Sequence, residues 1–288
     1  MDAVCGTGVP NVAATHGATA NVKKMRARGT CIAMVNHYNP LRLSDVAVTR
    51  VTYIRRRGGQ NRIMTTVSLP ETVGEIAAQY PASIRVFEKH GIDFCCGGKR
   101  PLSTICQEKA ADLEAVLNEL TAEIAATPAA DRDWQSAPIN DLVDHILTTH
   151  HSYLKQQLPR IQAMLDKVAG KHTQHSDVLL PLQRVFTAMH EELDSHLMKE
   201  EMILFPAIRG AGASHCGGIE NPIRVMLMEH DSAGEALAEI RRLTNDFEPP
   251  ADACNTYRGL WFELGELEGD LHRHIHLENN ILFPRVLA

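Results

Sequence analysis

The sequence predicts an all-α protein in which a small helical N-terminal domain precedes an up-down-up-down bundle of four long helices. Two observations support this fold. From residue 139 onward, apolar residues recur at steps of three and four over four long segments, as on amphipathic helices. In addition, the phrase H-x-x-x-E-x-x-I-L-F-P ends two of these segments, at 196–206 and at 274–284, so the bundle contains an internal repeat.

The composition is that of an ordinary globular protein. The chain has 288 residues, of which 44% are apolar, and this suffices for a hydrophobic core. No uninterrupted apolar run approaches the roughly 18 residues that a membrane span needs, and the start lacks a secretory signal pattern. Seven cysteines, an odd number, argue against a disulfide framework and for reduced thiols. We therefore expect a cytoplasmic protein without a membrane partner.

Charge divides the chain into two parts. Residues 1–63 carry ten Lys and Arg against two Asp, a net charge of +8, whereas the remaining 225 residues carry a net charge of −14. The acidic body argues against nucleic-acid binding, which needs clustered Lys and Arg. Because 1–63 shows no sustained period and many turn formers, we expect a disordered basic leader, or an over-called start with Met64 as the true one. Its Arg-rich, acid-poor composition is also compatible with a transit peptide.

Residues 64–127 are expected to form the small helical domain. Ser68, followed by Pro and Glu, resembles a helix start, and this helix should run to about Tyr80. A second helix is expected over 82–90, because Gly91 stands where a left-handed C-terminal cap is wanted.

Two cysteines and two glycines follow at 95–98 and predict a tight turn with exposed backbone. A longer helix over 112–125 completes the domain, and residues 128–136 form a linker. The bundle then occupies 137–288. Its connections are short enough to make neighbouring helices antiparallel, and its four helices are expected over 139–168, 175–208, 221–246 and 253–283.

The repeated phrase carries the candidate metal ligands. A spacing of four places His196 with Glu200, and His274 with Glu278, on one helical face. The first and third helices each present a histidine 44 or 45 residues before the histidine of the repeat, so each hairpin supplies one His and one His/Glu pair. His150 is a rival to its neighbour on the first helix, since both fall near the inward stripe. The six candidates are His151, His196, Glu200, His230, His274 and Glu278.

The residue types limit the metal. Unpaired carboxylates in an apolar core are costly, so two of them facing each other call for a cation. Imidazole and carboxylate ligands without thiolate suit iron, manganese or zinc and disfavour an iron–sulfur cluster in the bundle. Two bridging glutamates with two histidines per metal leave coordination positions open for an oxo bridge or a diatomic ligand.

Several phrases resemble one protein family. The H-x-x-x-E-x-x-I-L-F-P phrase resembles the haemerythrin-like domain, and the segment 93–99, Asp-Phe-Cys-Cys-Gly-Gly-Lys, resembles the N-terminal domain of the repair-of-iron-centres proteins. Further matches are Asp-Trp-Gln-Ser-Ala-Pro at 133–138, Met-His-Glu-Glu-Leu at 189–193 and Glu-His-Asp-Ser-Ala-Gly at 229–234. Together they cover about residues 69–287.

The resemblance implies a cytoplasmic protein, often a homodimer, with two non-haem iron ions, which restores iron–sulfur clusters damaged by nitrosative or oxidative stress. It implies iron rather than manganese, and His151 rather than His150. The partners would be damaged iron–sulfur proteins, with nitric oxide or O₂ as a small ligand. The mechanism remains open. The protein could repair clusters by donating iron or by removing nitric oxide, it could be an enzyme that reduces nitric oxide, or it could be a haemerythrin-like carrier or sensor of O₂ or nitric oxide. Whether it is an enzyme therefore also remains open.

Cys95 and Cys96 are the candidate reactive residues. Adjacent cysteines form a disulfide only with strain, so we expect free thiols that hold iron transiently, accept a nitrosyl group or contact a client cluster. We expect Cys106, Cys216 and Cys254 to be packing residues, and the other histidines, including His172, His175, His272 and His276, to lie at the surface or behind the ligands.

Overall fold

The computed structural model describes residues 21–27, 30–36, 49–53, 65–69, 72–127, 132–210 and 218–288. The chain divides into two compact units, Met1–Leu69 and Pro70–Ala288. The second unit contains both the small helical domain and the bundle. Within the described residues, no helix is both long and apolar enough to cross a membrane.

The first unit contains a four-stranded antiparallel sheet with the order β1-β2-β3-β4. Its strands are β1 (Asn21–Ala27), β2 (Thr30–Asn36), β3 (Thr49–Tyr53) and β4 (Thr65–Leu69). The expectation of a disordered leader over 1–63 does not hold for β1, β2 and β3, which lie within that range. All four strands are short, and β2, β3 and β4 each contain Val and Thr, which favour extended backbone, whereas β1 has a single Val. Five to seven residues give too little alternation to be noticed. Since β4 ends at Leu69, the unit boundary also lies later than residue 63. The remainder of the leader lies outside the described residues.

The small helical domain contains α1 (Val73–Gln79), α2 (Ser83–Lys89), α3 (Leu102–Glu108) and α4 (Leu113–Ala126). Thr72 and Glu75 form the capping box of α1, whereas Ser68, the predicted helix start, lies in β4. Gly91 has φ +58°, which confirms the left-handed cap after α2. Helix α3 was not expected, because it starts directly after Pro101 without a side-chain cap and no glycine follows its end.

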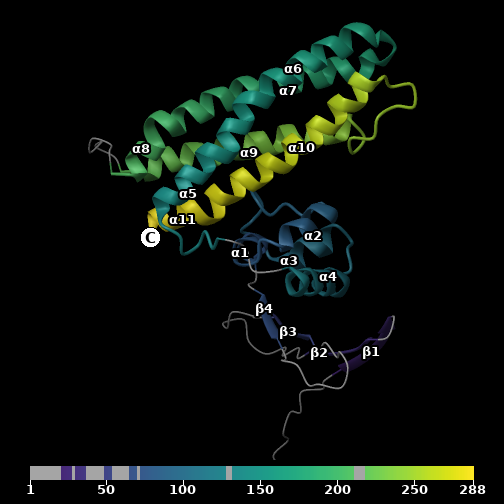
Figure 1. Ribbon diagram of the computed structural model, residues 1–288, viewed down its shortest axis with the longest axis vertical. Helices are drawn as coiled ribbons and strands as arrows, with labels where there is room; N and C mark the ends of the chain where they lie inside the picture. Colours follow the sequence, from purple (N-terminus) through teal and green to yellow (C-terminus); the bar gives the residue numbers. More distant parts are fainter. Residues whose placement is uncertain are drawn as a thin grey trace, which may run out of the picture. The chain divides into compact units, whose positions relative to one another are not determined.

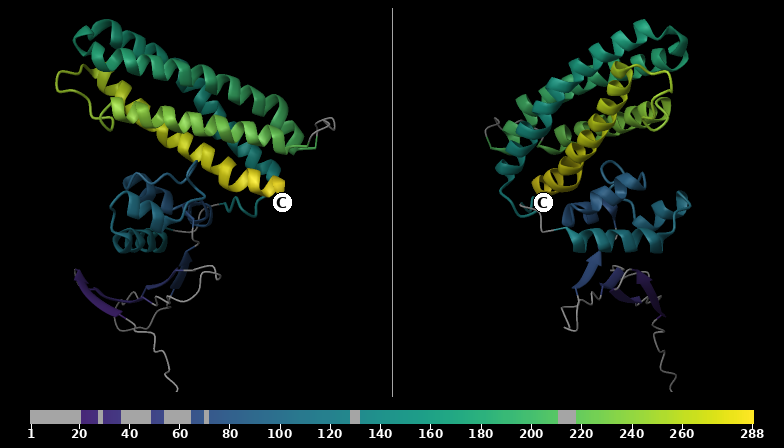
Figure 2. Two further views of the ribbon diagram at one scale, coloured as in Figure 1. Left: turned by 180° about the vertical axis from the view of Figure 1, so that it is seen from behind. Right: turned by 45° about the vertical axis from the view of Figure 1, so that its right-hand side comes forward.

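Three of the four long helices of the bundle are built from consecutive segments, and the third is a single helix (Figures 1 and 2). The first consists of α5 (Ile139–His145), η1 (Ile146–His151) and α6 (Ser152–Lys171), and the second of α7 (Ser176–Lys199), η3 (Glu200–Leu204) and α8 (Phe205–Ile208). The third is α9 (Glu220–Leu243). The fourth consists of α10 (Asn255–Leu277), η4 (Glu278–Leu282) and α11 (Phe283–Leu287). Helix α6 packs against α7 and α10, and α7 packs against α9. The predicted four-helix bundle is thus confirmed.

Two apolar clusters fill the bundle, and a polar layer separates them. One cluster contains Leu142, Ile146, Leu204, Met226 and Ile281, and the other contains Leu154, Leu193, Ala233, Leu271 and Ile275. On every helix the candidate metal ligands stand between members of the two clusters. A polar group at this depth must find a partner, because water cannot reach it.

Candidate metal centre

The bundle changes its winding where the candidate ligands stand. Segments η1, η3 and η4 are π-helical turns, and His151, Glu200 and Glu278 lie within them. The N–H of Phe205 bonds to the carbonyl of Glu200, five residues back, and Phe283 does the same with Glu278. The proline of each I-L-F-P phrase comes next and cannot donate a normal helical hydrogen bond, which favours this wider turn. Such turns are frequent at functional sites.

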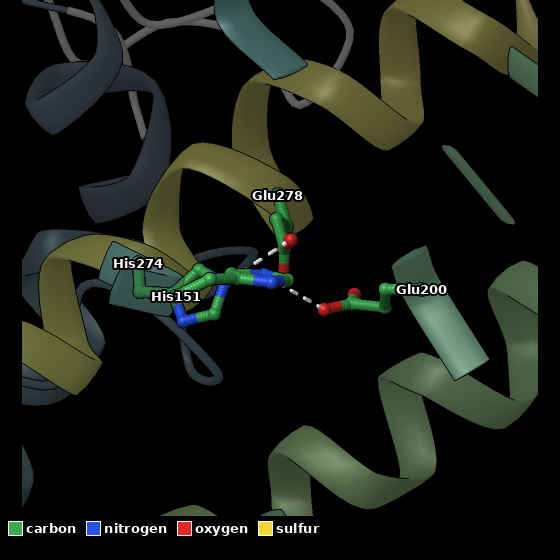
Figure 3. A group of neighbouring side chains, drawn as sticks. All are labelled: His151, Glu200, His274 and Glu278. Carbon is green, nitrogen blue, oxygen red and sulfur yellow. Dashed lines mark ion pairs between the residues drawn. The ribbon is translucent and has the colours of Figure 1, made fainter. Parts of the chain in front are cut away.

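The structure brings all six candidates together. Each is buried, with at most 3% of its surface exposed. The Nε2 atoms of His151 and His196 lie 3.3 and 3.4 Å from Glu200 Oε2. In the same way, His230 Nε2 lies 3.1 Å from Glu278 Oε2, and His274 Nε2 lies 3.2 Å from Glu278 Oε1. Figure 3 shows the two carboxylates converging on the imidazoles of His151 and His274.

The six residues form two overlapping groups of donors. One group contains His151, His274 and both glutamates. We call it the outer group, because its histidines come from the first and fourth helices in the chain. The inner group, from the second and third helices, is His196 and His230 with both glutamates. In each group the ligand atoms lie within 4.8 Å of one another. The glutamates are therefore shared, and each group draws its histidines from both hairpins, a pairing that the sequence spacing does not reveal.

Hydrogen bonds at Nδ1 fix how three of the imidazoles are turned. His151 Nδ1 lies 2.9 Å from Glu201 Oε1, and His196 Nδ1 lies 2.9 Å from Glu229 Oε2. His230 Nδ1 lies 2.7 Å from Asn279 Oδ1. A ring that donates its Nδ1–H to these acceptors has a free lone pair at Nε2, which faces the cluster. Histidines that bind metals are held in this way in most proteins.

Unsatisfied atoms at the centre fit a cation. The Nε2 atoms of His151 and His274 and all four carboxylate oxygens are buried and lack an aligned hydrogen bond. Burial raises the pKa of Glu200, and the nearby Glu278 carboxylate raises it further. At Glu278 burial acts in the same direction but is outweighed by the imidazoles of His274 and His230, so its pKa falls well below the usual range. Two buried carboxylates thus compete for charge compensation, which a bound cation would supply to both.

The structure separates His150 from His151. His150 Nδ1 lies 2.9 Å from Asp270 Oδ1, and its ring stacks on His274 with centroids 5.4 Å apart. It therefore supports a candidate ligand from behind, whereas His151 faces the glutamates. His276 is also turned away from the cluster. It is nevertheless buried, with its ring 5.5 Å from that of Phe94.

The Cys95–Cys96 turn lies directly against the bundle. Cys96 Sγ lies 3.4 Å from the backbone carbonyl oxygen of His230, a candidate ligand. Cys95 is 3% exposed and belongs to the bundle's core cluster, which corrects the expectation of an exposed turn. The thiol of Cys96, burial and the nearby Asp93 carboxylate together raise the pKa of the Cys95 thiol. Cys96 is half-buried and is the more accessible of the two.

Two side chains hold the turn in place. The Asp93 carboxylate accepts hydrogen bonds from the backbone N–H groups of Cys95, Cys96 and Gly97. From η4, Asn280 Nδ2 donates to the carbonyls of Phe94 and Cys95 at 3.1 and 3.2 Å. A Cβ at Gly98 would lie 2.5 Å from Asn280 Oδ1, so only glycine allows this close approach. Asn280 follows Glu278 by two residues, so the turn is fastened to the π-helical segment of a candidate ligand.

Sequence reasoning did not foresee the residues behind the candidate ligands. Glu201, Glu229, Asn279 and Asp270 all contact histidines of the site or His150. Three of them stand next to a candidate ligand in the sequence, and this was the one sequence feature that could have identified them. Asp270 stands four residues before His274, one turn along the same helix.

Comparisons with known proteins agree with this geometry. Residues 142–286 match the haemerythrin HHE cation-binding domain, and residues 69–124 match the ScdA N-terminal domain, described as a domain of unknown function. The iron-sulfur cluster repair protein YtfE of Cronobacter sakazakii is 42% identical over 218 residues, covering 76% of this chain and 96% of that protein. The proteins of the same name from Escherichia coli O8 and Shigella boydii serotype 4 are also 42% identical, covering 76% of this chain and 97% of theirs. The chain therefore belongs to the YtfE family of iron–sulfur cluster repair proteins, as its sequence resemblance predicted, and its haemerythrin-type domain indicates that it binds iron.

Proposed function

We propose that this protein repairs iron–sulfur clusters damaged by nitrosative or oxidative stress, and that it does so in the cytoplasm by donating iron. The observation that carries the proposal is the contact between the Cys95–Cys96 turn and the buried cluster of four histidines and two glutamates. A carrier of a diatomic ligand would need only the bundle. The names of the relatives support the same function.

The metal site of the proposal is a pair of non-haem iron ions. Glu200 and Glu278 would bridge the pair, with His151 and His274 on one ion and His196 and His230 on the other. When bound, the pair supplies exchangeable iron and open coordination positions for a diatomic ligand such as nitric oxide. The chain's own task is to keep four Nε2 lone pairs pointed inward and to exclude water with an apolar layer on each side.

The thiols supply the exit route in this proposal. Cys96 is half-buried, so its sulfur is within reach of a docked protein while it also touches the carbonyl of His230. Iron that leaves the inner group is cargo, and a thiolate can hold it briefly because sulfur is a good ligand for iron. The partner is a damaged iron–sulfur protein. A homodimer remains the assembly that we expect.

The test uses Cys96→Ser in the iron-loaded protein. A nitrosylated iron–sulfur protein serves as client, and recovery of its cluster absorbance is measured. Nitric oxide consumption by the reduced protein is measured separately with an electrode. We expect repair to fall at least about tenfold while iron content and nitric oxide consumption stay unchanged, because Cys96 belongs to neither donor group.

Cys106→Ser is the matched control, since Cys106 is another free thiol of the small helical domain. It should repair as the unchanged protein does. Full repair by Cys96→Ser would remove the thiol from the mechanism. If metal-free protein repaired the client equally well, iron donation itself would be excluded.

A further inference from the structure

A second group of metal-binding side chains lies in two loops at one end of the bundle. The turn between α6 and α7 carries His172 and His175, and the loop between α9 and α10 carries Asp252 and Cys254. Both connections lie at the same end of the four long helices (Figures 1 and 2). The candidate iron ligands stand many turns away, near the other ends of α7 and α10. None of these four residues is therefore part of the site already described.

The local backbone places each pair on one side of its loop. Residues Thr173–His175 form a 3₁₀ turn, η2, in which the N–H of His175 bonds to the carbonyl of His172 at 2.9 Å. His172 is the N-cap residue of this turn, and its ring and that of His175 both pack on Tyr257, so the two imidazoles lie on the same side of the loop. In the facing loop, Arg258 donates to the carbonyls of Ala251 and Ala253 and so holds Asp252 and Cys254 in position.

The donor atoms of the two loops already lie opposite each other. His172 Nε2 is 3.2 Å from Cys254 Sγ, and His175 Nε2 is 3.0 Å from both carboxylate oxygens of Asp252. Around a tetrahedral zinc ion, bond lengths of about 2.3 Å to sulfur and 2.0 Å to nitrogen place adjacent ligand atoms about 3.5 Å apart. Both observed separations are within about half an ångström of that value.

We propose that His172, His175, Asp252 and Cys254 form a second metal site, specific for a thiophilic divalent cation of the zinc type, which clamps the two loops together. Two imidazoles, one thiolate and one carboxylate are a donor set that suits zinc in a closed tetrahedral site. The ligand atoms of no three of these residues lie within 4.8 Å of one another, and the rings of His172 and His175 are 6.5 Å apart, so side-chain rotation must draw the two pairs onto one ion. Asp252 and Cys254 are exposed, so their side chains have room to rotate once their contacts with His175 and His172 are replaced by bonds to the metal.

Neighbouring residues favour a site over a chance contact. Cys254 occupies the N-cap position of α10, yet its side chain caps no backbone N–H and is available to another partner. Gln174 Nε2 lies 3.5 Å from both His172 Nδ1 and Asp252 Oδ2, and so links the two pairs. Buried Tyr257 packs against both imidazoles and forms the floor beneath them.

The experiment adds Co²⁺ to the full-length protein after its bundle has been loaded with iron. A thiolate bound to cobalt gives a charge-transfer absorption that the sulfur-free iron site cannot produce. We expect this absorption to saturate at one equivalent of Co²⁺ and to vanish when Zn²⁺ displaces the cobalt. Iron content is measured in parallel, so failure of this site is distinguished from failure of the iron site.

Four variants decide the assignment. Cys254→Ser should abolish the absorption, and His175→Ala should weaken Zn²⁺ binding at least about 100-fold, since even residues behind a ligand contribute 10–100-fold. Circular dichroism and iron content verify that both variants fold. His190→Ala is the matched control, because His190 also pairs with an exposed aspartate, Asp194, but lies outside the loops. Three results would overturn the proposal: the absorption persists in Cys254→Ser, it is lost in Cys96→Ser, or it never forms. The two pairs would then be only a thiol–imidazole hydrogen bond and a surface ion pair.

Discussion

The two donor groups share their glutamates but differ in their surroundings. In the inner group both imidazoles have an Nδ1 partner, and the Nε2 atoms of His196 and His230 face each other at 3.2 Å. In the outer group only His151 has such a partner. His274 has none among the described residues and is positioned instead by stacking on His150.

The difference shows that an internal repeat need not produce equivalent positions. The inner group is fixed by hydrogen bonds and touches the thiol turn through His230. The outer group is held more loosely and lies under His150 and Asp270. The repeated sequence motif provides the same ligand types to both metal positions, and the residues that surround the ligands make the two positions different. We expect the inner position to bind iron more tightly and to be the one that communicates with Cys96.

The largest effect is expected from the shared carboxylates. Glu200→Ala and Glu278→Ala should each remove both irons, because each glutamate belongs to both groups. Metal analysis of the purified variants measures this. His272→Ala is the control and should retain its iron, since His272 belongs to neither group. If His272→Ala emptied the site while Glu278→Ala left it full, the choice of helix face would be wrong.

Single histidines should separate the two positions. His151→Ala removes a ligand of the outer group only, and His196→Ala removes one of the inner group only. Each variant should retain about one iron per chain, and the iron left in His196→Ala should exchange faster because it occupies the looser position. Chelator competition measures the exchange rate. Complete loss of iron from both variants would show that the positions fill only together.

The residues behind the ligands should have a smaller effect. Glu201→Gln and Glu229→Gln each weaken the acceptor for a histidine Nδ1–H and should lower iron affinity about 10–100-fold. Glu235→Gln, at an exposed position of α9, provides the control. Iron affinity is obtained by chelator titration. Unchanged affinity in both variants would mean that these bonds do not orient the imidazoles.

The last effect concerns the face covered by the small helical domain and is a change in stability rather than in iron binding. Burial lowers the pKa of His276 to about 4. Between about pH 6.5 and pH 4 this imidazole is therefore neutral in the folded protein but protonated in the unfolded chain. Stability should therefore fall as the pH drops from about 6.5 to about 4, by up to about 3 kcal/mol from this residue. Urea unfolding of metal-free protein over this range should show a shallower decline for His276→Gln. Parallel curves for the two proteins would contradict the assignment.

The bundle and its six candidate ligands could be predicted because both depend on spacing along helices. Apolar periodicity defines a helix face, and two copies of one phrase identify the histidines and glutamates on it. His150 and His151 could not be separated in this way. They are neighbours on the same turn, and the contacts that decide between them, from His151 to Glu200 and from His150 to Asp270, join different helices.

Other features depend on tertiary contacts and escaped prediction. The division into outer and inner groups follows from how the four helices pack, which spacing along one helix does not encode. The burial of Cys95 depends on Asn280, nearly 200 residues away along the chain. The pairing of His172 and His175 with Asp252 and Cys254 joins two loops that look unremarkable separately. Strands β1 to β4 were missed because short strands carry too few periods, and helix α3 because, unlike α2, it has no glycine cap to mark its end.

The most direct test of the account is the iron content of the pure protein. Expression in iron-replete medium, followed by metal analysis of the unchanged protein and of Cys254→Ser, separates the bundle from the proposed second site. We predict two irons per chain in both proteins, since each donor group has four ligands of the right kind. One iron per chain, or zinc in place of iron in the Cys254→Ser protein, would contradict the central claim.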